Sequence, residues 1–113
     1  MKPTLIVIIG RRWFDKRAGN TYHDAEIIVH GLDVAGQMIP AAGIIHYRTH
    51  MTYGYDDSYV ETGAKWLDEQ KVISRREYAN GGSQPLWQYC QDNGIKLITS
   101  VVDVGSRKEL KGA

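Results

Sequence analysis

The chain has 113 residues, of which 42% are hydrophobic and 24% charged, and its formal net charge is +1 at pH 7. This length fits one domain without a second core, and the composition is typical of a folded globular protein. The small net charge excludes a strongly basic nucleic-acid-binding protein but permits a local basic patch. A single cysteine, Cys90, excludes an intramolecular disulfide and a cysteine-based zinc site, and favours a reducing compartment such as the cytoplasm.

The first predicted element is a strand over residues 4–9 (TLIVII), which are apolar on both faces and rich in β-branched side chains. This run is far shorter than the ~20 residues of a spanning helix, and it lacks the small-residue cleavage site of a signal peptide. We therefore expect no membrane segment. The pattern predicts a central strand, or one that packs at the interface of a homo-oligomer.

A basic and aromatic segment follows. Arg11, Arg12, Lys16 and Arg17 lie beside two aromatic rings, and Gly19-Asn20 then predicts a turn into a strand over residues 22–30 that alternates polar and apolar side chains. The two strands are predicted to form an antiparallel hairpin with the basic segment near its tip.

A glycine-bounded loop is expected over residues 31–36 and a third strand over 42–53. Ser58 followed by Glu61 predicts a capping box at the start of a helix that ends near Lys71, and Gly63 within that helix indicates close approach to the sheet.

A second helix is predicted to be capped by Ser83 with Pro85 in its first turn, and to end at Gly94. A final strand over residues 95–104 precedes a polar, loose tail over 105–113. The order β-β-β-α-α-β predicts a single α+β domain over residues 1–113. Its sheet would have three to four mostly antiparallel strands, with two helices packed on one face.

Signals for catalysis are weak. On a strand, His46 and His50 would lie about 13 Å apart, too far to share one metal ion, although one of them could combine with His23 and Asp56 across the fold. Cys90 is expected to be a buried, inert thiol. We assign no catalytic residue, no metal site and no cofactor.

The connector between the two predicted helices contains a double glycine that is a candidate phosphate site. Gly81-Gly82 before a helix could hold a phosphate on free N–H groups, although a double glycine is more often a plain loop.

The hairpin tip provides the best candidate binding site. Arginines grip phosphate through paired donors, aromatic rings stack on bases, and a carboxylate in the loop after the third strand could accept from a ribose hydroxyl or a base amine. Alternatively, Trp13 and Phe14 are core or interface anchors and the arginines a solvated rim. The candidate ligand-binding residues are Arg11, Arg12, Trp13, Phe14, Asn20, Tyr22, His23, Tyr53, Tyr55 and Asp56.

Several of these residues form short motifs: RRWF at residues 11–14, GNTYH at 19–23, YGY with an acid at 53–56, and WL at 66–67. With these motifs the first two-thirds of the chain resembles a family of small bacteriophage and prophage proteins. Asp57 departs from the pattern, where a bulkier polar residue is expected. The resemblance implies a setting rather than an activity: a phage protein in the cytoplasm of a host bacterium, where small accessory proteins counter host defence by binding.

Two main hypotheses follow. The first is a non-enzymatic anti-defence protein that sequesters a nucleotide-like ligand, with phosphate and base, in a pocket at the tip; a subunit interface is one way to bury such a ligand. The second is a protein–protein inhibitor of a host defence complex such as a CRISPR effector, with the aromatic residues as anchors. A small nuclease or phosphodiesterase using His23, His46 and Asp56 is a weaker alternative, and nucleic-acid binding is possible but not favoured.

Overall fold

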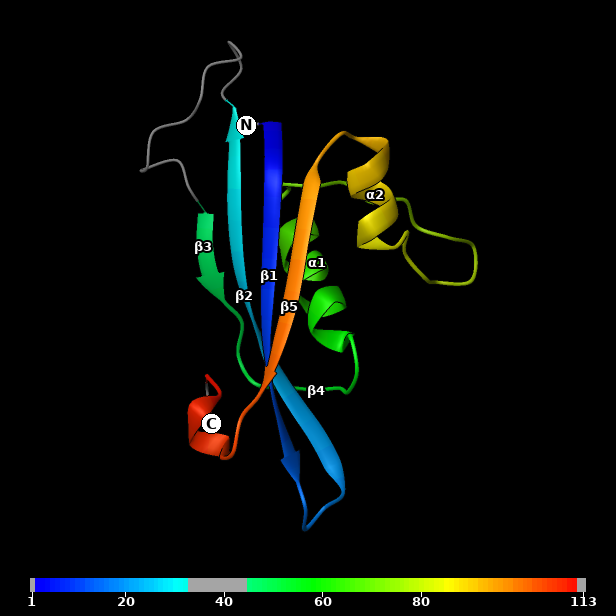
Figure 1. The fold of residues 1–113 in the computed structure, drawn as a ribbon. Coiled ribbons are helices and arrows are strands. Elements are labelled where there is room, and N and C mark those ends of the chain that lie inside the picture. Colours follow the sequence, from blue (N-terminus) through cyan, green and yellow to red (C-terminus); the bar gives the residue numbers. More distant parts are fainter. Residues whose placement is uncertain (1, 33–44, 112–113) are drawn as a thin grey trace.

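Two long antiparallel strands form the centre of the fold, β1 (Lys2–Asp15) and β2 (Asn20–Leu32). The computed structural model describes residues 2–32 and 45–111 (Figure 1). Gly19, at φ +71°, supplies the left-handed backbone that the reversal needs, and the Asp15 carboxylate accepts hydrogen bonds from the amides of Arg17 and Ala18. The predicted hairpin is confirmed, and its tip projects past the rest of the sheet (Figure 1).

Within residues 2–32 and 45–111 the sheet has five strands: β3, β2, β1 and β5 are neighbours in that order, and β4 also pairs with β2. β3 (Ile45–Arg48) and β4 (Thr52–Tyr53) are antiparallel to β2, whereas β5 (Lys96–Asp103) is parallel to β1. The sheet is therefore mixed but mostly antiparallel. With its two helices it confirms the predicted α+β class.

The third predicted strand is divided into β3 and β4. Between them, Thr49 bonds twice to Ala25: its amide donates to the Ala25 carbonyl at 2.8 Å, and its hydroxyl accepts from the Ala25 amide at 2.9 Å. This side-chain hydrogen bond interrupts the regular ladder. The loop predicted over residues 31–36 begins too early, because β2 continues through Gly31 to Leu32; its residues 33–36, and residues 42–44 of the third predicted strand, lie outside the described residues.

Helices α1 (Ser58–Glu69) and α2 (Leu86–Asp92) pack on one face of the sheet, here called the helix face (Figure 1). The core lies between them and the strands and consists mainly of Ile6, Ile8, Ala25, Ile27, Val29, Tyr59, Ala64, Leu67, Leu86 and Cys90. None of the helices described in residues 2–32 and 45–111 is both long enough and apolar enough to cross a membrane.

Gly63 confirms the predicted close approach of α1 to the sheet, because a Cβ there would lie 2.9 Å from Cδ1 of Ile8. The predicted capping box of α1 is wrong: Asp57 occupies the N-cap position without a side-chain hydrogen bond. The Ser58 hydroxyl instead donates to the Tyr55 carbonyl at 2.6 Å, within the tight turn that precedes the helix. The predicted Ser83 cap of α2 is also wrong, since Pro85 is the N-cap.

The C-terminal segment differs from the loose tail expected from its polarity. A short 3-10 helix, η2 (Arg107–Glu109), begins with a capping box between Ser106 and Glu109. Leu110 is buried, and the Lys111 amide donates to Asp24 at 2.9 Å. As far as Lys111 this segment is docked on the sheet.

The apolar first strand is central, as predicted, because β1 lies between β2 and β5. Its alternate residues Ile6 and Ile8 are fully buried under the helices, and Val7 and Ile9 are half-buried on the opposite face. Both edges of β1 are paired inside the chain along residues 5–12. An oligomer interface that uses the edge of β1 is therefore excluded there.

Candidate functional site

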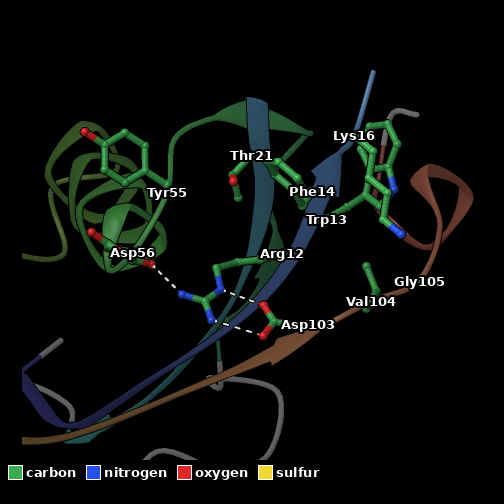
Figure 2. Close-up of a pocket in the computed structure, with 10 residues that line it drawn as sticks. All are labelled: Arg12, Trp13, Phe14, Lys16, Thr21, Tyr55, Asp56, Asp103, Val104 and Gly105. Atoms are coloured by element: carbon green, nitrogen blue, oxygen red, sulfur yellow. Dashed lines mark hydrogen bonds and ion pairs between the residues drawn. The ribbon is translucent and has the colours of Figure 1, made fainter. Parts of the chain in front are cut away.

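A hollow of about 450 Å³ lies beside the hairpin tip and is called the tip hollow below (Figure 2). Segments far apart in the sequence build its walls: the end of β1, the start of β2, the loop before α1, and the end of β5. The lining residues are Arg12, Trp13, Phe14, Lys16, Thr21, Tyr55, Asp56, Asp103, Val104 and Gly105.

Arg12 is held from two sides at the floor of this hollow. The β1–β5 register sets it directly beside Asp103, whose carboxylate accepts from Nε at 2.9 Å and from Nη2 at 3.3 Å. On the other side, Nη1 donates to the backbone carbonyl of Asp56 at 3.3 Å (Figure 2). A guanidinium carries five N–H groups, and these bonds use three of them. Arg12 is thus oriented and retains donors for an anion.

Aromatic rings border the same hollow. The Phe14 side chain is 54% exposed and that of Tyr55 is 62% exposed, so both offer ring surface to a ligand. Trp13 is half-buried and stacks on Tyr22, with ring centroids 6.0 Å apart and planes inclined by 23°. Tyr22 in turn meets the ring of Tyr53 edge-on at 5.8 Å. These contacts brace the indole at the base of the tip.

Buried His23 anchors the loop that carries Tyr55 and Asp56. A carbonyl oxygen can only accept, so Nδ1–H of His23 donates to the Gly54 carbonyl at 3.1 Å. In the neutral ring, Nε2 then accepts from the Thr62 hydroxyl at 2.6 Å. Burial lowers the pKa of His23 below 6.5, which favours this neutral form.

The anchored loop has a constrained backbone. Gly54 has φ +154°, and a Cβ there would lie 2.8 Å from Cβ of Ser58 and 3.0 Å from Cε1 of His23. Asp56 has φ 52°, a left-handed conformation that a non-glycine residue adopts infrequently. This conformation directs the Asp56 carbonyl at Arg12.

The structure brings together five of the ten candidate residues in the tip hollow: Arg12, Trp13, Phe14, Tyr55 and Asp56. Asn20, Tyr22, His23 and Tyr53 do not line it. Asn20 is the first residue of β2, and His23 anchors the loop through the Gly54 carbonyl. Tyr22 stacks on Trp13, and Tyr53 packs against Tyr22.

Arg11 points away from the hollow, because consecutive residues of a strand face opposite sides. Its Nη2 donates to the buried carboxylate of Asp24 at 2.6 Å, and its Nε donates to the same group at 3.2 Å. This hydrogen bonding raises the pKa of Arg11. Arg11 therefore has a structural partner that the sequence did not reveal.

Sequence reasoning missed Thr21, Asp103, Val104 and Gly105, and it noted Lys16 only as part of the basic segment. Asp103 enters the site through the parallel pairing of β5 with β1, which joins residues 91 positions apart. The only signal for it in the sequence is an acid at the end of the last predicted strand.

A second hollow of about 530 Å³ adjoins the first and shares Trp13, Phe14, Lys16 and Gly105 with it. Its remaining lining residues are Asp15, Arg17 and Arg107. Among the described residues, neither Lys16, Arg17 nor Arg107 forms an ion pair. We call this cationic region the basic hollow.

The histidines considered for a metal site or a nuclease do not lie together. The strand alternation puts His23 on the helix face, whereas His46, opposite Ile28, is on the other face and bonds Glu26 at 2.5 Å. Across residues 2–32 and 45–111, no group of three or more His, Cys, Asp or Glu side chains is placed to hold a metal ion.

The double glycine Gly81-Gly82 and the single cysteine Cys90 also have structural explanations. The Gly82 amide donates to Asn80 and the Gly81 amide to the Tyr78 carbonyl, so these groups are used within a tight turn. Burial raises the pKa of the Cys90 thiol to about 11, which keeps it protonated.

Comparisons with family models, with curated proteins and with solved structures find no match to this chain.

Proposed function

We propose that the tip hollow binds a nucleotide-like ligand, with phosphate and base, and that the protein acts by sequestering it. One observation supports this most: the oriented guanidinium of Arg12 and the exposed rings of Phe14 and Tyr55 line the same cavity. Cationic forks recognise phosphate and flat rings recognise bases.

The base would lie against Phe14 or Tyr55. Stacking of a base on an aromatic side chain contributes ~1–3 kcal/mol, and it tolerates different bases because each has a π-face. The carboxylates of Asp56 and Asp103 line the same hollow and could accept hydrogen bonds from an exocyclic amine or a ribose hydroxyl.

The phosphates would lie toward Arg12 and the basic hollow. Lys16 lines both hollows, and Arg17 and Arg107 add two more cations on the far side. A ligand with two or more phosphates, or a cyclic dinucleotide, could reach from the rings to these cations. Opposite charge at short range would then supply much of the affinity.

The setting of the proposal comes from the sequence motifs. Their resemblance to phage and prophage proteins supports an anti-defence role in the cytoplasm of a host bacterium. Sequestration of a signalling nucleotide requires affinity and no reaction, so the proposal assigns no catalytic residue.

Titration calorimetry tests the proposal with a panel of nucleoside monophosphates, nucleoside diphosphates, cyclic dinucleotides and ADP-ribose. We expect at least one member to bind and to be recovered chemically intact after the protein is denatured. Recovery of a cleaved product would contradict sequestration, and absence of binding across the panel would contradict the nucleotide class.

A second candidate function, inhibition of a host defence complex through direct protein contact, is favoured by a specific observation. Phe14, Tyr53 and Tyr55 are each more than half exposed at the same end of the molecule, and exposed aromatic residues are common anchors of protein interfaces. Affinity purification from host lysate distinguishes the two. One dominant partner, lost in a Tyr53→Ala variant, supports inhibition, whereas a clean eluate counts against it.

A further inference from the structure

The outer edge of β5 is unpaired. β5 is the last strand of the sheet on the side away from β3 (Figure 1), and within residues 2–32 and 45–111 no strand pairs with its outer edge. An unpaired edge presents backbone N–H and C=O groups on which another strand can add. Proteins usually protect such edges with proline, a bulge or a central charge. The eight residues of β5 (KLITSVVD) carry none of these between Lys96 and Asp103.

Exposed apolar side chains border this edge on both faces of the sheet. On the face opposite the helices, Ile98 is 42% exposed and Val102 is 55% exposed. On the helix face, Leu97 and Thr99 line a hollow of about 360 Å³ together with Trp87, which is itself 61% exposed. Apolar surface gathered on both sides of an open edge indicates a protein partner.

We propose that β5 pairs antiparallel with β5 of a second copy, so that two sheets join into one continuous sheet across a homodimer. In an antiparallel ladder, directly opposed residues lie on the same face of the sheet. A two-fold axis at Ser100 satisfies this rule. It sets Ile98 opposite Val102 of the partner subunit, and the same contact recurs on the other side of the axis, as an isologous interface requires.

This arrangement matches side chains as well as backbone. Opposed residues in an antiparallel pair have Cβ atoms about 4.5–5.5 Å apart, so the two most exposed apolar side chains of β5 would cover each other. Lys96 and Asp103 lie only at the ends of the strand, so the middle of the seam carries no charged side chain.

The dimer also bears on the candidate site. With the axis at Ser100, Lys96 of the partner subunit lies opposite Val104, which lines the tip hollow. Each hollow would then be at an end of the seam between subunits. The dimer itself does not depend on the identity of any ligand.

Sedimentation equilibrium on the intact chain tests the proposal. We expect a species of twice the 12.8 kDa chain mass. The double variant Ile98→Lys with Val102→Lys should sediment as a monomer, because like charges would face each other across the seam. Both side chains are exposed, so the variant should keep the far-ultraviolet circular dichroism spectrum of the wild type and should still unfold cooperatively. Tyr78→Lys, at an exposed site in the connector before α2, is the matched control and should leave the dimer intact.

A charge swap tests the register. Ile98→Lys combined with Val102→Glu places opposite charges across the seam at both symmetric contacts, and it should restore the dimer that the double-lysine variant loses. A wild-type monomer would overturn the proposal. A dimer that survives the double-lysine substitution would overturn the β5 interface, and failure of the charge swap to restore association would overturn the axis at Ser100.

Discussion

Arg12 and Asp103 form a two-point ion pair across the parallel β1–β5 junction, with Nε to Oδ1 at 2.9 Å and Nη2 to Oδ2 at 3.3 Å. The Asp103 side chain is 75% exposed. Exposed ion pairs contribute only about 0–1 kcal/mol to stability. The pair therefore orients Arg12 more than it stabilises the fold. An incoming phosphate can bind the Arg12 guanidinium beside the Asp103 carboxylate or displace that carboxylate from it.

Replacing Arg12 should thus affect binding far more than folding. Arg12→Ala removes charge-assisted hydrogen bonds worth about 1.5–3 kcal/mol, so we expect affinity for the nucleotide ligand to fall about 10- to 100-fold. Urea unfolding should show a loss of no more than about 1 kcal/mol. Titration calorimetry measures the first quantity. Equal affinity in the variant and the wild type would show that Arg12 is not part of the binding site.

The basic hollow should make binding sensitive to salt. Interactions between exposed charges are screened over about 8 Å at physiological ionic strength, so the affinity should fall as sodium chloride is raised. Arg107→Gln should reduce both the affinity and this salt dependence. Lys65→Gln, an exposed cation on α1, serves as the control and should change neither. A salt dependence identical in the two variants would argue against phosphate in the basic hollow.

Stability should depend on pH through His23. Burial lowers its folded-state pKa below 6.5, so on acidification the unfolded chain binds a proton first. The free energy of unfolding then falls as the pH drops below about 6.5, by up to about 1.4 kcal/mol per pH unit, until the folded-state pKa is reached.

The variant His23→Gln isolates this contribution, since the other titrating groups remain. It should be less stable near neutral pH by about 1–3 kcal/mol because the Gly54 and Thr62 bonds are disturbed. Denaturant unfolding is measured at about pH 7.5 and about pH 5.5. Between these two pH values the free energy of unfolding should fall less in the variant than in the wild type. An equal loss in both proteins would mean that His23 does not titrate differently on folding.

Packing against β1 predicts a strong effect at Gly10. A Cβ there would lie 2.4 Å from Cγ and 2.7 Å from Cδ2 of the buried Tyr59 ring. Gly10→Ala should therefore cost at least about 1–3 kcal/mol of stability, measured by thermal or urea unfolding. Gly105→Ala is the matched control, because a Cβ there meets nothing within 4 Å. A Gly10→Ala protein as stable as the control would contradict the close contact of α1 with β1.

Local patterns in the sequence predicted the parts of the fold that depend on neighbours in the chain. The alternation over residues 22–30 and the turn at Gly19 were sufficient for the hairpin. Gly63 correctly indicated contact between the first helix and the sheet. Capping was predicted less well, because Ser58 has a closer acceptor in the preceding turn, the Tyr55 carbonyl.

Long-range pairing could not be predicted in the same way. Nothing local indicates that the final strand pairs parallel to the first, and this pairing brings Asp103 to Arg12. The docking of the polar tail is equally non-local, since the Lys111 amide finds its acceptor 87 residues earlier, at Asp24. The opposite directions of Arg11 and Arg12 follow from strand alternation, once the strand is known to extend through the basic segment to Asp15.

The central claim is that exposed rings at the tip hold the base of a nucleotide. Titration calorimetry with the tightest-binding member of the nucleotide panel, on the wild type, Tyr55→Ala and Tyr78→Ala, tests it most directly, because the two tyrosines are both exposed and only Tyr55 lines the hollow. We predict that Tyr55→Ala weakens binding about fivefold or more, as loss of ~1–3 kcal/mol of stacking requires, while Tyr78→Ala binds as the wild type does. Equal affinity in all three proteins, or no binding by any of them, would contradict it.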